Sequence, residues 1–295
     1  FATASSAMAE RSVLIVGAQG QRGYELRRTA GGRQGVAAVD RADVDIADAG
    51  SVERVVRQYR PGVIINAAAY TAVDRAEEQR ELAWAVNCSG AGNLAAAASA
   101  SGARLLHVST DFVFDGNGCR PCRSLDKTQP RSVYAASKAA GERAVLENCR
   151  DARVVRTSWL YSAHGHNFVK TMLRLMAERD AVSVVADQVG TPTWARVLAE
   201  ALWGLLETDA IGICHCSNNG VASWYDFAVA IQEEALAAGL LRRAVPVRPI
   251  RSEDYPLPAR RPVYSVLDVA DTETLLGVTF PHWRESLRSM LAELQ

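Results

Sequence analysis

Short apolar runs alternate with longer helical stretches along the first half of the chain. The run at 12–17 is β-branched and ends in glycine, which is typical of a strand buried on both faces. Similar runs predict strands at 35–39, 62–66, 104–108 and 153–158, and helical stretches separate them at 24–29, 51–59, 77–101 and 134–148. This alternation predicts an α/β fold with a doubly wound parallel sheet.

A glycine-rich turn follows the first predicted strand directly. Gly17, Gly20 and Gly23 are spaced G-x-x-G-x-x-G, and a helical stretch comes next. A strand, glycine turn and helix in this order bring backbone N–H groups and a helix N-terminus close to a pyrophosphate. The context therefore indicates a Rossmann dinucleotide site, and a tight turn without a ligand is the alternative.

The end of the second predicted strand carries two opposing signals for the cofactor. Asp40 is positioned to bind the adenosine ribose hydroxyls, whereas Arg41 beside it suits a 2′-phosphate. We therefore expect NADPH and NADH both to be usable. The small residues that follow the third strand, from Ala67 to Thr71, leave room for a cofactor across the sheet edge, although tight helix packing would also explain them.

Three polar groups, from Thr110, Asp111 and Tyr134, are predicted to converge on this edge. Tyr134 and Lys138 are about one helical turn apart, so their side chains share one face of a helix. An ammonium beside a phenol lowers the phenol pKa from its reference value of about 10, which makes Tyr134 a candidate general acid. Thr110 and Asp111 follow the fourth strand, and parallel strands bind ligands at that end.

Composition excludes several other classes of protein. The 295 residues include 33 basic and 33 acidic side chains, so the chain lacks the basic character of a nucleic-acid or anionic-membrane binder. No apolar run reaches the roughly 20 residues that span a bilayer. The first nine residues lack the features of a signal peptide. We expect a cytoplasmic protein that acts on a small molecule.

The pattern changes after residue 160. A helix is predicted at 167–178, a strand at 182–185, a turn-rich segment at 187–193 and a final helix up to residue 294. We expect a tail at 1–10, an NAD(P)-binding Rossmann domain at 11–160, and at 161–295 a smaller C-terminal α/β domain that mainly binds substrate, with some segments packing back on the Rossmann domain.

The motifs together resemble one enzyme family. Gly17-x-x-Gly20-Gln21-x-Gly23, Asn66 to Asp74, Ser109 to Phe114, Tyr134-x-x-x-Lys138, Arg156 to Trp159 and Pro258 to Pro262 appear in the order found in the dTDP-4-dehydrorhamnose reductase family, part of the extended short-chain dehydrogenase/reductases. The resemblance implies reduction of the C4 ketone of a dTDP-linked 6-deoxy-hexulose, giving dTDP-L-rhamnose, by NADPH or NADH.

The resemblance also implies roles for individual residues. Tyr134 would protonate the carbonyl oxygen, Lys138 would hold the nicotinamide ribose, and Thr110 would bind the carbonyl as the third catalytic residue. The implied substrate-binding residues are Thr110, Asp111, Trp159, Asn167 and Arg260. The implied cofactor-binding residues are Gly17, Gly20, Gln21, Arg22, Gly23, Asp40, Arg41, Asp45, Ile46, Ala67, Ala69, Tyr70, Thr71, Tyr134 and Lys138.

Departures from the family pattern keep two alternatives open. Arg22 replaces an apolar residue, Ala135 replaces a glycine, and Cys122 and Ser124 stand where the family has an aromatic and a glutamate. The alternatives are a reductase for another dTDP-4-keto-6-deoxysugar, including a ring-rearranging one, and a non-catalytic regulatory subunit of the same fold. A dTDP-sugar is the expected partner, and the chain is expected to be a monomer or homodimer.

We predict no metal site and no disulfide framework. Some relatives dimerise through magnesium held by glutamates, and Glu25 matches one such position, but Arg196 stands at another. The six cysteines include Cys119 and Cys122 in a C-x-x-C spacing, without a second such pair. We therefore expect free thiols.

Overall fold

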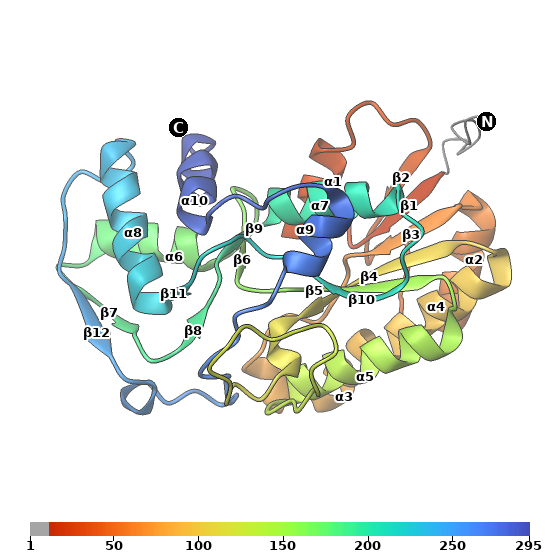
Figure 1. Ribbon diagram of the computed structural model, residues 1–295, viewed down its shortest axis with the longest axis horizontal. Helices are drawn as coiled ribbons and strands as arrows, with labels where there is room; N and C mark the ends of the chain where they lie inside the picture. Colours follow the sequence, from red (N-terminus) through yellow and green to blue (C-terminus); the bar gives the residue numbers. More distant parts are fainter. Residues whose placement is uncertain (1–11) are drawn as a thin grey trace.

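The computed structural model describes residues 12–295. Its largest element is a six-stranded sheet in the order β10-β5-β4-β3-β1-β2, in which every neighbouring pair is parallel (Figure 1). The strands are β1 Val13–Val16, β2 Val36–Val39, β3 Val63–Asn66, β4 Arg104–Thr110, β5 Ala152–Thr157 and β10 Gly212–His215. The predicted doubly wound parallel sheet is confirmed, and the predicted tail at 1–10 lies outside the described residues.

Helices cover both faces of this sheet. Alternate residues of β1 point to opposite faces, so Val13 and Ile15 belong to one apolar cluster and Leu14 and Val16 to the other. The first cluster includes residues of α1 Gln21–Arg28 and α7 Ala195–Leu206, and the second those of α2 Ala49–Tyr59, α4 Gly90–Ser101 and α5 Val133–Asn148. Continuous apolar strands are what burial on both faces requires.

The helix predicted at 77–101 is interrupted. It begins with a 3-10 turn, Arg75–Glu77, continues as α3 Arg80–Trp84 and passes through a π-helical turn, Ala85–Ser89, into α4. The π turn contains Asn87, whose side chain is buried and hydrogen bonds to Tyr70 and to Ser137 of α5. A π turn inserts one residue into a helix, and such turns are frequent at functional sites.

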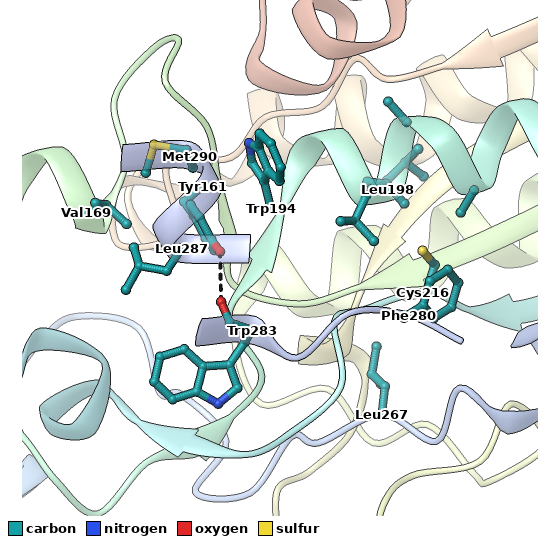
Figure 2. Close-up of a cluster of buried hydrophobic side chains, with 14 of the residues drawn as sticks. Tyr161, Val169, Trp194, Leu198, Cys216, Leu267, Phe280, Trp283, Leu287 and Met290 are labelled. Carbon is teal, nitrogen blue, oxygen red and sulfur yellow. Dashed lines mark hydrogen bonds between the residues drawn. The ribbon is translucent and has the colours of Figure 1, made fainter. Parts of the chain in front are cut away.

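The C-terminal half forms a second lobe, at the left of Figure 1. Its helices are α6 Phe168–Glu178, α8 Trp224–Ala237 and α10 Trp283–Ala292, and its paired strands are β6 Leu160–Tyr161 with β9 Thr193–Trp194, β7 Val182–Val185 with β12 Val247–Ile250, and β8 Val189–Gly190 with β11 Ala222–Ser223. Figure 2 shows part of the apolar cluster that continues from the α1–α7 face of the sheet into this lobe. There the buried Tyr161 hydroxyl donates to the Trp283 carbonyl at 3.3 Å.

Two segments of this half pack back on the first. Strand β10 pairs with β5 at the edge of the large sheet, and α7 contacts α1. Helix α9, Ala270–Leu276, contacts both β10 and α7. Within residues 12–295, no helix has the length and hydropathy of a membrane span.

Candidate active site

A cavity of about 720 Å³ opens at the carboxyl ends of the parallel strands. It extends from the glycine turn after β1, past the ends of β2 and β3, to the residues that follow β4 and β5. Most of the predicted site residues line it, namely Gly17, Gly20, Gln21, Arg22, Asp40, Arg41, Asp45, Ile46, Ala67, Ala69, Tyr70, Thr71, Thr110, Asp111, Tyr134 and Trp159. Parallel pairing brings the strand ends together, so this grouping follows from the sheet.

The glycine turn is specified by close backbone contacts. Gly17 has φ +89°, and a Cβ there would lie 2.7 Å from the Ala68 amide nitrogen. A Cβ on Gly23 would lie 2.2 Å from the Gly17 carbonyl oxygen, so this glycine supports the turn without lining the cavity. Gly20 is the N-cap of α1 and has no side chain to cap it. Free N–H groups of α1 therefore face the cavity, as a diphosphate site requires.

The carboxylate at the end of β2 is held in place by the backbone. Asp40 accepts hydrogen bonds from the Gln19 and Arg41 amides, both at 2.6 Å. Arg41 is exposed, lines the cavity, and takes part in no ion pair recorded for residues 12–295. Asp40 and Arg41 thus both line the same end of the cavity.

Tyr134 lies in the first turn of α5. Ser132 caps this helix by accepting from the Ala135 amide at 3.2 Å. Burial raises the pKa of Tyr134, while the Arg22 guanidinium and the Thr110 hydroxyl oppose the rise. Arg22 is the cation that lowers the Tyr134 pKa in this structure. The lowering expected from Lys138 stays a prediction. Burial therefore keeps the phenol protonated.

Lys138 lies beneath the cavity and does not line it. Its side chain is about 1% exposed, and Nζ donates to the Val108 carbonyl at 2.7 Å and lies 3.2 Å from His107 Nε2. Burial, followed by the charge of Arg22, lowers the Lys138 pKa to about 7. The role expected of Lys138 at the nicotinamide ribose stays a prediction.

Thr110 and Asp111 form a buried pair after β4. The Thr110 hydroxyl donates to Asp111 Oδ1 at 3.1 Å and accepts from the Phe112 amide at 3.3 Å. Burial raises the Asp111 pKa to about 7, although the Ser265 and Thr110 hydroxyl groups oppose the rise. Its other oxygen, Oδ2, is buried without a hydrogen-bond partner. The cavity is thus lined by a carboxyl group, that of Asp111, whose pKa lies near neutral pH.

Arg156, the first residue of the Arg156 to Trp159 motif, forms a buried ion pair with Glu142. Arg156 donates to both carboxylate oxygens of Glu142, at 2.9 and 2.7 Å, and Ser109 donates to Glu142 at 2.5 Å. Arg156 and Glu142 are both buried. This bidentate pair joins β5 to α5 and supports the end of β4.

Of Trp159, Asn167 and Arg260, which were predicted to bind substrate, only Trp159 lines the cavity. Trp159 lines the cavity with a left-handed backbone, φ +44°, and stacks on Trp224 with ring centroids 3.6 Å apart. Asn167 does not line the cavity; it caps α6 and donates to Gln21 Oε1 at 3.1 Å. Arg260 is exposed and does not line the cavity either, and its neighbour Arg261 pairs with Asp74 at 2.7 Å.

The surroundings of Glu25 and the state of the cysteines bear on the predictions about metal and disulfides. Glu25 is buried and lies 3.4 Å from Arg196 Nε, so an arginine occupies the space beside it. Within residues 12–295, no group of three or more His, Cys, Asp or Glu side chains could hold a metal ion. All six cysteines are free thiols.

Several cavity residues were not predicted from the sequence. Gln19, His166 and Leu82 line the cavity from the glycine turn, the segment after β6 and α3. Gln19 lies inside the glycine motif, so its place next to Gly20 was a usable signal. Leu82 lies outside the motifs, and only the fold brings it to the site. His166 directly precedes Asn167, a predicted site residue, so its position was also a usable signal.

Comparison with known proteins gives the family. The family model described as the RmlD substrate binding domain matches residues 11–295. The chain is 41% identical to dTDP-4-dehydrorhamnose reductase of Aggregatibacter actinomycetemcomitans, with 95% of this chain and 98% of that protein covered. It is 44% identical to the Mycobacterium tuberculosis reductase, with 97% and 94% covered. The chain belongs to the dTDP-4-dehydrorhamnose reductase family. The resemblance inferred from the motifs is confirmed.

Solved structures of the family have the same fold. A dTDP-4-dehydrorhamnose reductase from Clostridium acetobutylicum aligns with a TM-score of 0.92 at 41% identity, covering 96% of this chain and 99% of that one. The Bacillus anthracis reductase in complex with NADP aligns with a TM-score of 0.90 at 39% identity and the same coverage. A structure of a family member with NADP bound is therefore known.

Proposed function

We propose that this protein reduces the C4 ketone of dTDP-4-dehydro-L-rhamnose to dTDP-L-rhamnose with NADPH or NADH. The observation that carries the proposal is one continuous cavity, which joins the glycine turn and Asp40 to Tyr134, Thr110 and Trp159. A dinucleotide on the turn and a sugar beside Tyr134 can therefore meet in the same space. The relatives named as this reductase support the choice of sugar.

The cofactor end of the cavity fits a dinucleotide. The Gly17 position leaves no room for a Cβ, and the N–H groups of α1 suit the diphosphate. Asp40 suits the ribose hydroxyls of NADH, and the exposed Arg41 suits the 2′-phosphate of NADPH. When bound, the cofactor supplies the hydride. We assign residues 11–160 to cofactor binding and most of 161–295 to the substrate side.

The catalytic end suits protonation of a carbonyl oxygen. Tyr134 donates its proton to the oxygen as the C4 carbon is reduced, and its raised pKa keeps that proton available at neutral pH. The Thr110 hydroxyl orients the carbonyl beside it, with Asp111 behind. Lys138 holds the nicotinamide ribose, and the positive charge of Arg22 lowers the pKa of the Tyr134 phenol.

The sugar side of the cavity has an aromatic wall. Trp159 offers an apolar indole to the 6-deoxy part of the sugar, and its rear face is covered by Trp224. Asn167 acts indirectly, because it holds Gln21 and the start of α6. The exposed Arg260 contacts the diphosphate of the substrate only if the loop at 258–262 moves toward the cavity.

The test is turnover with a chemically defined substrate. Oxidation of NADPH and of NADH is followed with dTDP-4-dehydro-L-rhamnose, and the product is identified by NMR. We expect turnover and dTDP-L-rhamnose. A different epimer, or turnover only with another dTDP-4-keto-6-deoxysugar, would replace the proposed substrate. Cofactor binding without turnover of any such sugar would favour the regulatory reading.

A further inference from the structure

Residues 259–268, which we call the strap, run between the two lobes. The strap bonds to strand β8 of the C-terminal lobe through two backbone contacts. The Val189 N–H donates to the Val263 carbonyl at 2.7 Å, and the Ser265 N–H donates to the Val189 carbonyl at 2.8 Å. Because both bonds join the strap to one residue of β8, the two segments should move together.

The opposite side of the strap bonds to the segment between β4 and α5. The Tyr264 N–H donates to the Gly116 carbonyl at 3.2 Å. The Cys122 N–H donates to the Val266 carbonyl at 2.8 Å, and its own carbonyl accepts from the Asp268 N–H at 2.8 Å. The strap is therefore a shared backbone partner of the lobe of the large sheet and of the C-terminal lobe.

A charged pair fastens the start of the strap to the loop after β3. Arg261 donates to both carboxylate oxygens of Asp74, at 2.9 and 2.7 Å, and the Ala259 N–H donates to Asp74 Oδ1 at 3.2 Å. The hydrogen bond from Arg261 holds the Asp74 pKa below its ordinary value. The two side chains are 19% and 34% exposed, so water only partly screens the pair. A bidentate pair fixes relative orientation as well as distance.

The strap lies behind two residues that line the sugar side of the cavity. Ser265 is buried, and its hydroxyl group lowers the pKa of Asp111. The residue after Val189 is Gly190, where a Cβ would lie 2.5 Å from Trp159 Cε2. Moving the strap and β8 therefore moves the backbone on which the Trp159 indole lies, relative to Asp111.

We propose that Asp74 and Arg261 are positioning residues that, by fastening the strap, fix the separation between Asp111 and the Trp159 wall for the dTDP-sugar. Neither residue of the pair lines the cavity, so both act through the strap. Within residues 12–295, no recorded hydrogen bond joins the strap to the glycine turn at 17–23. The inference rests on the proposed function for the identity of the sugar.

A double-mutant cycle tests the pair. The KM and kcat for dTDP-4-dehydro-L-rhamnose, and the dissociation constant of NADPH, are measured for Asp74→Ala, Arg261→Ala and the double variant. We expect each single substitution to raise the sugar KM by about tenfold, and the double variant to show no further rise, because either change releases the same contact. The value of kcat should change much less, since Tyr134 is carried by α5, and the NADPH constant should stay at the parent value.

Other outcomes of the cycle contradict the proposal. Rises in the sugar KM that multiply in the double variant would mean that the two residues act independently. An effect of Arg261→Ala without one of Asp74→Ala would mean that the arginine binds the sugar nucleotide directly. An equal rise in the NADPH constant would mean that the pair supports the whole cavity.

Gly116→Ala displaces the strap with both charges intact. Gly116 has φ +82°, and a Cβ there would lie 2.6 Å from Pro262 Cα. We expect the same pattern, a raised sugar KM with an unchanged NADPH constant. An unchanged sugar KM in the folded variant would contradict the role of the strap, and the charge-pair cycle decides the question if this variant does not fold.

A second ion pair of the C-terminal lobe provides the matched control. Arg251 and Glu253 lie 3.0 Å apart, both exposed, and this pair does not bridge the lobes. Arg251→Ala removes the same kind of side chain from the segment just before the strap. We expect it to leave the sugar KM, kcat and the NADPH constant unchanged. A tenfold rise in its sugar KM would show that loss of any arginine in this segment suffices, and would overturn the proposal.

Hydrogen exchange followed by NMR tests the fastening without substrate. In Arg261→Ala we expect the Tyr264 and Cys122 amides, whose bonds join the lobes, to exchange about tenfold faster or more. The Ser265 amide, which bonds to β8, should keep its protection. Unchanged exchange at Tyr264 and Cys122 would overturn the proposal. Absence of turnover in the parent protein would instead refute the proposed function, so the two failures are distinguishable.

Discussion

The cavity and the aromatic cluster of the C-terminal lobe are both built from buried side chains, but of opposite kinds. Around the cavity lie Asp111, Lys138 and Tyr134, whose pKa values are all shifted toward the uncharged form by burial. In the lobe, Phe227 lies 5.5 Å from Tyr161 and 5.8 Å from Trp283 between ring centroids. The cavity region buries a carboxyl group, an amine and a phenol close together, whereas the lobe buries mainly aromatic surface, in which the Tyr161 phenol is also enclosed.

The difference indicates that one region provides acid–base chemistry and the other provides stability. Buried ionisable groups reduce stability but give acids and bases that act near neutral pH. Aromatic packing has no such chemistry, yet it stabilises the wall that carries Trp159, through Trp224 and Phe168. Substitutions in the first region should change activity and its pH dependence, and substitutions in the second should change stability.

The largest effect is expected for Tyr134→Phe. Loss of the proton donor should lower kcat by about 100- to 10,000-fold, because general acid catalysis contributes that much. NADPH affinity and the unfolding midpoint should stay near the parent values. Steady-state kinetics and cofactor titration check this, with the exposed Tyr255→Phe as the matched control. Near-parental turnover would show that another group, such as Asp111, gives the proton.

Phe227→Ala tests the opposite region. Phe227 is fully buried among three aromatic rings, so its removal should lower the free energy of unfolding by about 3–5 kcal/mol. Urea denaturation measures the loss, and Leu275→Ala, at a 40% exposed position, serves as control. We expect the folded fraction to keep its kcat. A large fall in kcat without a change in stability would contradict the proposed division.

Asp111→Asn tests whether the cavity reduces stability through charge. The folded pKa of about 7 lies above the unfolded value of about 3.9, so the folded state holds the proton more tightly between these limits. The stability contributed by this proton is present at low pH and is lost as pH rises toward 7. The parent should therefore lose stability over this window, and the variant should not.

The pH comparison gives the size of that effect. Relative to the parent, Asp111→Asn should be more stable at pH 8 than at pH 5 by about 2–4 kcal/mol in urea unfolding. The same substitution at the exposed Asp271 provides the control. Equal differences at both pH values would mean that Asp111 is ionised throughout.

The smallest effect is expected at the rim of the cavity. Arg41→Ala should raise the KM for NADPH by about tenfold and leave the KM for NADH unchanged, since an exposed guanidinium contributes roughly 1.4 kcal/mol to 2′-phosphate binding. Paired KM measurements check this against Arg27→Ala, which removes an exposed arginine of α1 outside the cavity. A parallel rise in both KM values would assign Arg41 to the shared part of the cofactor.

The sequence by itself determined the parallel sheet and the residues at its strand ends. Apolar β-branched runs, each followed by glycine or a polar residue, are local patterns, and parallel pairing brings their carboxyl ends together. Gly17, Asp40, Thr110 and Trp159 are found at one cavity for this reason. The motif order also carried enough information to identify the family.

Only the tertiary structure decided how deeply the site residues are buried, how their pKa values shift and which side chains pack against them. The buried contacts of Lys138, which lies in α5, are made with His107 and Val108 of β4. Trp224 covers Trp159 from 65 positions away, as their numbering shows, and the charge of Arg22 lowers the pKa of Tyr134, which is remote from it in sequence. Burial and hydrogen-bond direction depend on distances between segments remote in sequence, and local patterns carry no record of those distances.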